Sequence, residues 1–121
     1  MSRPAVPKAV AAHLPLKPTA LQILLSLAGG ERYGYAIIRE IADRTDGRVE
    51  LHPGALYRFI RRLDERGLIE ELEHRPVPES EDDERRRYYG ITPLGREVVT
   101  AEVQRMGKMM EWARDVELAG P

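Results

Sequence analysis

The sequence predicts a mainly α-helical domain with one small β-hairpin and a long C-terminal helix. Residues 53–66 repeat apolar side chains at helical spacing. Two strand-like runs, 68–73 and 85–91, follow and are separated by a polar loop that contains prolines. A new helical pattern begins at residues 92–93 and continues without a break. A helix followed by a hairpin, in this order, indicates a winged helix-turn-helix.

Residues 1–16 form the first predicted unit, an N-terminal arm or short helix. Three prolines interrupt this unit, and the stretch KAVAAHL between them has the length of one or two helical turns. Two interpretations stay open. The unit is either a frayed arm, because chain termini order only when they are held down, or an arm that packs on a partner subunit or touches phosphate.

Two core helices come next. The stretch ALQILLSLA gathers its leucines on one face, which predicts a buried helix. Residues 34–45 predict a second helix, with isoleucines inside and charged residues outside. Residues 48–51 alternate in polarity, so they predict a short third strand for the small sheet.

The helix at 53–66 carries one apolar side and one arginine-bearing side. Pro53 suits its first position, and Gly67 suits the residue after its end. The apolar side consists of Leu56, Phe59, Ile60 and Leu63. The opposite side consists of Gly54, Arg58, Arg61 and Glu65, flanked by Tyr57 and Arg62. A DNA major groove admits such a helix, because arginine offers paired donors to base edges and phosphates. The alternative is that these arginines pair with neighbouring acids on a solvated surface.

The last predicted element, residues 92–118, is a long helix that starts at an N-cap threonine followed by proline. Some of its apolar residues step by four and three, the spacing of a helix-pairing seam: Val99, Val103, Met106, Met110 and Ala113. A second strip lies beside them: Leu94, Val98, Met109, Trp112 and Val116. One small domain does not easily cover both strips, so we expect one to pack on its own domain and the other to meet a second subunit. The alternative is one wide face buried within a monomer.

Four stretches resemble, in order and spacing, the PadR family of bacterial transcription regulators. They are RYGYAIIREI, LHPGALYRFIRRLDERGLIEE, DDERRRYYGITPLGRE and the last long helix. The similarity spans about residues 17–118, and the short C-terminal part resembles the smaller subfamily, whose last domain is one helix. The resemblance implies a homodimeric repressor that binds double-stranded DNA at a palindromic operator. Its winged helix-turn-helix would span 17–91 and its dimerisation helix 92–118.

The arginine face and the resemblance together predict a set of DNA contacts. Tyr33 and Tyr35 match the family's glycine-tyrosine start of the first motif helix, with core packing of Tyr35 as the alternative. His52 replaces a small hydroxyl residue and is a weaker N-cap, although a protonated ring there could reach phosphate. Arg86 belongs to the basic wing strand, whereas the acidic EDDE tip at 81–84 is expected to point away from the duplex or stay mobile. The full set is Tyr33, Tyr35, His52, Gly54, Tyr57, Arg58, Arg61, Arg62 and Arg86.

The resemblance also implies a small aromatic effector, because PadR-like regulators often respond to phenolic or other flat compounds. The residues predicted to line a ligand space or the dimer interface are Val99, Val103, Met106, Met110 and Ala113. Methionine adapts to flat rings, which favours such a space. A dry, fully packed seam is the alternative, and Trp112 is a further candidate wall.

Composition restricts the other classes of function. The chain has no cysteine and its three histidines are far apart, so we expect no metal site and no cofactor. No nucleophile–histidine motif, P-loop or dinucleotide fingerprint is present, which argues against an enzyme. No apolar run approaches the roughly 20 residues of a membrane span, and the N-terminus lacks a signal core. We therefore expect a cytoplasmic protein that does not contact membranes.

The net charge of −1 argues weakly against a DNA-binding protein. Basic residues collect locally, however, because residues 1–30 contain three of them and no acid. Two alternatives therefore stay open: a winged-helix protein-interaction module that does not bind DNA, and a dimer that sequesters a ligand.

Overall fold

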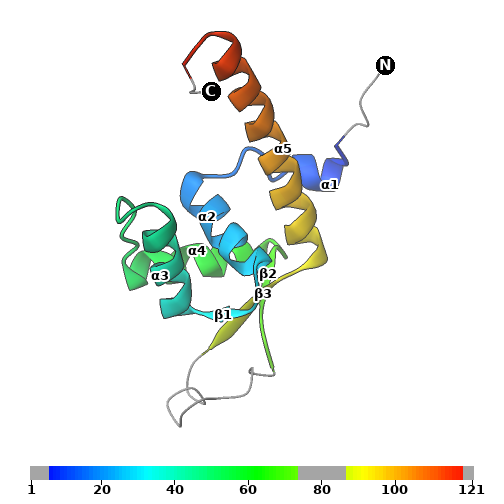
Figure 1. Ribbon diagram of the computed structural model, residues 1–121. Coiled ribbons are helices and arrows are strands. Elements are labelled where there is room, and N and C mark those ends of the chain that lie inside the picture. The colour runs from blue at the N-terminus through cyan, green and yellow to red at the C-terminus, as the bar shows by residue number, and fades with distance from the viewer. Residues whose placement is uncertain (1–5, 74–86, 119–121) are drawn as a thin grey trace.

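The computed structural model describes residues 6–73 and 87–118, which fold around one hydrophobic core (Figure 1). The elements, in chain order, are α1 (Lys8–Ala11), α2 (Pro18–Ala28), β1 (Arg32–Tyr33), α3 (Gly34–Arg44), α4 (Pro53–Glu65), β2 (Ile69–Glu71), β3 (Tyr88–Ile91) and α5 (Pro93–Asp115). The predicted fold class, mainly α-helical with a small sheet and a long C-terminal helix, is confirmed. Within the described residues, no helix is long and apolar enough to cross a membrane.

The sheet has three antiparallel strands in the order β1–β3–β2. Its third strand is not the one predicted, because residues 48–51 form no strand and β1 takes the place beside β3. Val49 and Leu51 instead pack as partly buried side chains against the core, and the Val49 N–H donates to the Thr45 hydroxyl at 3.1 Å. The alternation of polar and apolar residues at 48–51 thus arises because Val49 and Leu51 point toward the core from a loop. β1 has only two residues, and a strand this short shows no alternating pattern by which the sequence could predict it.

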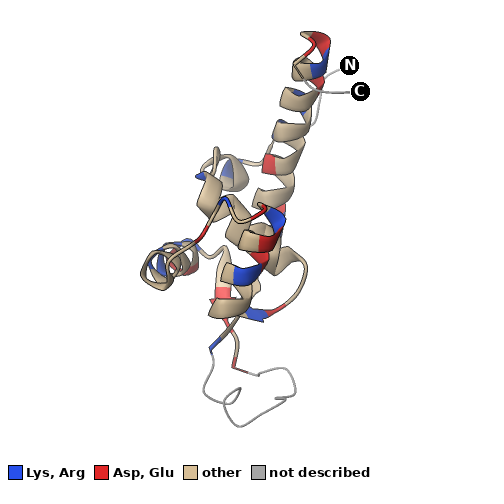
Figure 2. Cartoon of the chain, turned by 60° about the vertical axis from the view of Figure 1, so that its left-hand side comes forward, with Lys and Arg blue, Asp and Glu red and all other residues tan. Residues whose placement is uncertain are grey.

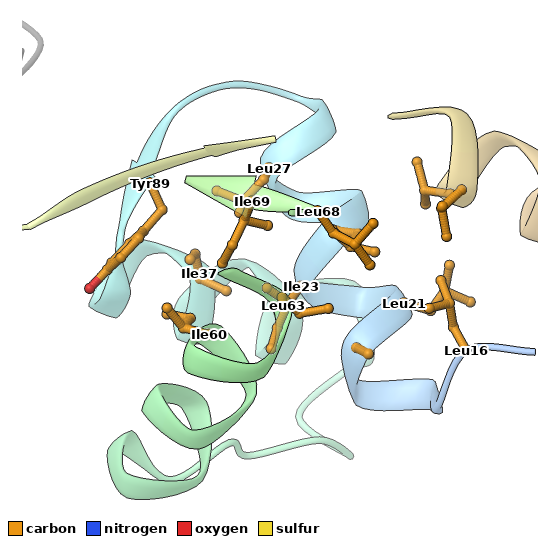
Figure 3. Close-up of a cluster of buried hydrophobic side chains, with 14 of the residues drawn as sticks. Leu16, Leu21, Ile23, Leu27, Ile37, Ile60, Leu63, Leu68, Ile69 and Tyr89 are labelled. Atoms are coloured by element: carbon orange, nitrogen blue, oxygen red, sulfur yellow. The ribbon is translucent and has the colours of Figure 1, made fainter. Parts of the chain in front are cut away.

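The core gathers apolar side chains from α2, α3, α4, α5 and the sheet. Ile23 and Leu27 of α2 and Ile37 of α3 are almost completely buried at its centre (Figure 3). The apolar side predicted for α4 is the side that packs inward: Leu56, Phe59, Ile60 and Leu63. Burial of one such side chain stabilises the fold by about 1.5–3 kcal/mol, so this packing fixes which side of α4 stays in solvent.

Residues 8–16 are held on α5 of the same chain and are not a frayed arm. α1 buries Val10, and Leu16 packs beside Leu21 of α2 (Figure 3). The Leu16 N–H donates to Oε2 of Glu102 at 2.6 Å. The N-terminal segment is therefore fixed to α5 by both apolar packing and a buried hydrogen bond.

Glu102 is a fully buried carboxylate with both oxygens occupied. Besides Leu16, Arg105 donates to it through Nε at 2.5 Å. The Arg105 guanidinium and the Leu16 N–H hold the pKa of the Glu102 carboxyl below its usual range, although burial acts in the opposite direction. This buried, hydrogen-bonded position of Glu102 was not predicted from the sequence. The available signal was its spacing, four residues after Val98 and three after Val99, which places it on the inward side of the helix.

We expect Glu102→Gln to lower the free energy of unfolding by about 1–2 kcal/mol at neutral pH, because the charge that both donors bind is removed. The folded-state pKa is depressed, so the carboxylate stabilises the fold above its unfolded-state pKa of about 4.3. That stabilisation is lost as the pH falls through the folded-state value. Urea unfolding across the acid range should therefore show the variant and the wild type converging.

Glu97→Gln is the matched control, since Glu97 is exposed on the same helix. It should change the free energy of unfolding by less than about 0.5 kcal/mol. A deficit for Glu102→Gln that persists undiminished to about pH 3 would contradict the assigned role of the carboxylate.

The start of α5 follows the predicted signals. Thr92 is the N-cap, its hydroxyl accepts from the Gly95 N–H at 3.0 Å, and Pro93 holds the first helical position. The helix ends at Asp115, slightly before the predicted end near residue 118. The N-terminal half lies against the domain, and the C-terminal half projects beyond it (Figure 1).

The apolar residues of α5 divide along the helix rather than around it. Val98 and Val99 are 0% and 4% exposed and belong to the core of their own chain. The predicted seam, which began at Val99, is therefore open to solvent only from Val103 onward. The exposed apolar residues of this C-terminal half, here called the α5 strip, are Val103, Met106, Met109, Met110, Trp112, Val116 and Leu118.

Candidate nucleic-acid interface

The start of α4 brings three of the predicted contact residues together. Nδ1 of His52 accepts from the Gly54 N–H at 3.2 Å and so caps the helix. A Cβ on Gly54 would lie 3.5 Å from that nitrogen and 3.8 Å from Nη1 of Arg58. The ring nitrogen of His52 thus takes the place of the hydroxyl group that commonly caps a helix.

The exposed side of α4 carries Arg58, Arg61 and Arg62 in solvent, opposite the buried apolar side. Among the described residues, none of the three forms an ion pair, and neither Asp64 nor Glu65 is their partner. The alternative of internal pairing on a solvated surface therefore has no support in the described part of the chain. Unpaired guanidinium groups offer planar pairs of donors to an incoming anion.

Tyr57 packs across the start of α3. A Cβ on Gly34 would lie 2.8 Å from the Tyr57 hydroxyl oxygen, so the absence of a side chain at Gly34 makes room for this ring. Tyr57 is 45% exposed. Tyr57 therefore lies against the start of α3 while part of its ring stays in solvent, where it can still reach a partner.

A second exposed group lies at the junction of β1 and α3. Tyr33 accepts from Nη2 of Arg39 at 2.5 Å, and its ring meets Tyr88 edge-on at a centroid distance of 5.5 Å. Tyr35, in the first turn of α3, is 62% exposed, so it does not pack in the core beside Ile38. From the sequence, Arg39 was predicted only as one of the outward charges of residues 34–45. Its hydrogen bond to Tyr33 joins α3 to β1, a contact that helical spacing does not indicate.

The wing is described only in part. Arg86 and the EDDE tip lie outside the described residues. Beside them, Arg87 pairs with Glu71 across the hairpin at 3.5 Å. Tyr88 and Tyr89 are buried in the sheet, and burial raises the pKa of the Tyr89 hydroxyl. These two rings therefore stabilise the sheet and are not available to stack on bases.

Basic and acidic residues are interspersed over α3, α4 and α5 (Figure 2). On α4 the exposed side carries Arg58, Arg61 and Arg62 beside Glu65, so positive charge exceeds negative charge there. Within residues 6–73 and 87–118, no cluster of histidine and carboxylate side chains has the arrangement of a metal site. The chemistry that this surface offers is hydrogen bonding and charge pairing with an anionic partner.

Comparison with known proteins gives both a family and structural neighbours. Residues 23–101 match the family described as transcriptional regulator PadR-like. An uncharacterized protein X of Lysinibacillus sphaericus is 31% identical over 96 residues, which cover 79% of each chain. The complex structure of hsRosR-S4, from H. salinarum, has a TM-score of 0.62 and 25% identity, over 94% of this chain and 84% of that chain. A PadR family transcription regulator from Clostridium difficile has a TM-score of 0.62 and 21% identity over 83% of this chain and 98% of that chain, a likeness of fold.

Proposed function

This chain belongs to the PadR-like family of transcriptional regulators, and we propose that it represses transcription by binding double-stranded DNA as a homodimer. The observation that carries the proposal is the row of exposed arginines on α4, which are unpaired within the described residues. α4 enters the major groove, where Arg58 and Arg61 bind guanine edges or phosphate oxygens. The N-terminus of the helix approaches the backbone, where the positive end of the helix dipole favours phosphate.

The group at the start of α3 supplies backbone contacts beside this groove. The exposed Tyr35 and the paired Tyr33 and Arg39 offer hydroxyl and guanidinium donors on the same motif as α4. Such contacts fix register on the duplex without reading sequence. We expect Arg86 to contribute from the wing, as the resemblance implies.

The α5 strip supplies the dimer interface. Large apolar side chains that are exposed together on one helix mark interaction surfaces, and a second copy of the helix would cover several of them. Two-fold symmetry then places two α4 helices in successive major grooves about 34 Å apart, on a partly palindromic operator.

Arg61→Ala should weaken binding to the cognate operator by about 1–3 kcal/mol if Arg61 reads a base. Binding is measured by fluorescence anisotropy on DNA from upstream of the protein's own coding sequence, with scrambled DNA beside it, across a salt series. The logarithm of the binding constant should fall with the logarithm of salt by about 0.9 per phosphate contact.

Arg96→Ala is the control, because Arg96 is an exposed arginine on another helix, in the first turn of α5. It should leave affinity within about twofold of the wild type. Unchanged affinity for Arg61→Ala would remove Arg61 from the contact set. A protein that binds no DNA even at low salt would instead be an interaction module or a ligand-sequestering dimer, despite its fold.

A small aromatic effector completes the proposal, since Met106 and Met110 of the α5 strip can adapt to a flat ring between two subunits. Val99 does not line this space, because it is buried in its own chain. Titration of aromatic ligands while the fluorescence of Trp112 is followed tests this part. Flat titrations over a broad panel would count against a ligand space beside Trp112.

A further inference from the structure

A cavity of about 400 Å³ lies between the segment 12–17 and the C-terminal half of α4. On α4, its wall consists of Phe59, Leu63, Arg62 and Arg66. At 100° per residue, Phe59, Arg62 and Arg66 share one flank of the helix, on the opposite side from Tyr57 and α3. This space is therefore separate from the surface where α3 and α4 meet, and separate from the α5 strip.

The charged side chains that line the cavity are all basic. Lys17, Arg62 and Arg66 bring three positive charges, His13 adds an imidazole, and no acidic side chain lines the space. Within the described residues, none of the three cations has an ion-pair partner. Like charges gathered without a counter-charge favour an anion, and two arginines suit the paired oxygens of a carboxylate.

The remaining lining is apolar. Leu14 and Pro15 from the linker face Phe59 and Leu63 from α4. An inorganic ion would leave this part of the wall in contact with water, whereas a molecule with an apolar body would cover it. Ligand cavities of roughly 300–1,000 Å³ with mostly apolar walls and few polar groups are typical small-molecule sites.

We propose that this cavity binds a small organic anion, with its carboxylate at Lys17, Arg62 and Arg66 and its apolar body against Leu14 and Phe59. One ligand would thus contact the basic wall through its carboxylate and the apolar wall through its body. The site lies within one subunit and differs from the space between subunits described above.

Arg62 links this site to α4's exposed face, because it stands at the border between the cavity flank and the side that carries Arg58 and Arg61. A bound carboxylate and a DNA phosphate would compete for its guanidinium. The linker itself is fixed to α5 through Leu16 and Glu102, so the ligand contacts a segment tied to the long helix. This regulatory consequence rests on the proposed function, whereas binding at the site does not.

The test uses the full chain, isotope-labelled for two-dimensional NMR and titrated with naphthoate and with its neutral amide, naphthamide. Naphthoate should produce saturable amide shifts centred on residues 12–17 and 59–66, and naphthamide should bind at least about tenfold more weakly. The double substitution Arg62→Gln and Arg66→Gln should raise the dissociation constant of naphthoate at least about tenfold. The control removes two exposed arginines elsewhere, Arg96→Gln with Arg114→Gln, and should leave it unchanged.

Three results would overturn the proposal: no saturable shifts, shifts confined to the α5 strip, or equal affinity for acid and amide. Shifts at the cavity produced by duplex DNA and not by naphthoate would also overturn it and make these cations phosphate contacts. Because the naphthoate titration itself contains no DNA, its result is independent of whether the protein binds an operator. Anisotropy with naphthoate present then measures the regulatory consequence separately.

Discussion

Gly95→Ala should lower the free energy of unfolding by about 2–3 kcal/mol, a large change for one methyl group. A Cβ at this position would overlap the carbonyl oxygen of Leu68 and would lie 2.9 Å from Cγ1 of Ile91. The first of these neighbours is backbone, so a change of rotamer cannot relieve the overlap. Either the start of α5 or the start of β2 must move.

Hydrogen bonds oppose that movement. The Thr92 N–H donates to the Leu68 carbonyl at 3.1 Å, and the Thr92 hydroxyl donates to the Gly67 carbonyl at 2.5 Å. The same hydroxyl accepts from the Gly95 N–H. The first turn of α5 is therefore docked on the residues that follow α4, and an added methyl group has to break part of this arrangement.

Gly107→Ala provides a matched control with the opposite expected sign. No heavy atom lies within 4 Å of a Cβ at Gly107, which is in the middle of the same helix. Alanine is the better helix former by about 1 kcal/mol, so this variant should be slightly more stable within one subunit. Because Gly107 lies one helical turn from Val103 and Met110 of the α5 strip, the comparison is made at protein concentrations at which the subunits are dissociated. Urea unfolding at one fixed protein concentration compares the two, since dimer stability depends on concentration. A loss of stability of equal size in both variants would contradict the steric explanation.

The sequence predicted the elements whose ends carry local chemistry. Pro53 and Gly67 delimit α4, and Gly67 has the positive φ of 75° that favours glycine after a helix. Thr92 and Pro93 likewise start α5. Contacts between distant segments were not predictable in this way. β1 was missed because two residues form no pattern, and the docking of Gly95 on Leu68 joins residues that no local spacing relates.

In the candidate site, too, the residues set by local helical spacing were predictable and the contacts between distant segments were not. Arg58 and Arg61 were predicted because helical periodicity alone places them opposite the apolar side of α4. The grouping of Arg39 with Tyr33 depends on how β1 leads into α3, which the sequence did not show. The cavity beside Arg62 depends on the linker 12–17 lying along α4, a contact between segments that are distant in the sequence. The hydrogen bond between Leu16 and Glu102 holds the same linker on α5.

The proposed dimerisation through the α5 strip predicts the second large effect. In a two-fold interface each substitution occurs twice, so loss of one buried methionine at about 1.5–3 kcal/mol counts double. Met110→Glu also places a charge where the partner helix would pack. We expect this variant to raise the dimer dissociation constant at least about 100-fold, measured by analytical ultracentrifugation over a concentration series.

Gln104→Glu is the matched control, because it adds the same charge to an exposed position on a different side of α5. It should remain dimeric. Operator affinity is a second test of the interface. In a dimer, the second recognition helix binds at high effective concentration once the first is bound, and a monomer loses this contribution. We therefore expect Met110→Glu to weaken operator binding at least about 100-fold. Single-site contacts to DNA are untouched by the substitution, so half-site binding should persist. If Met110→Glu stays dimeric and keeps its operator affinity, the α5 strip is not the surface that pairs the subunits.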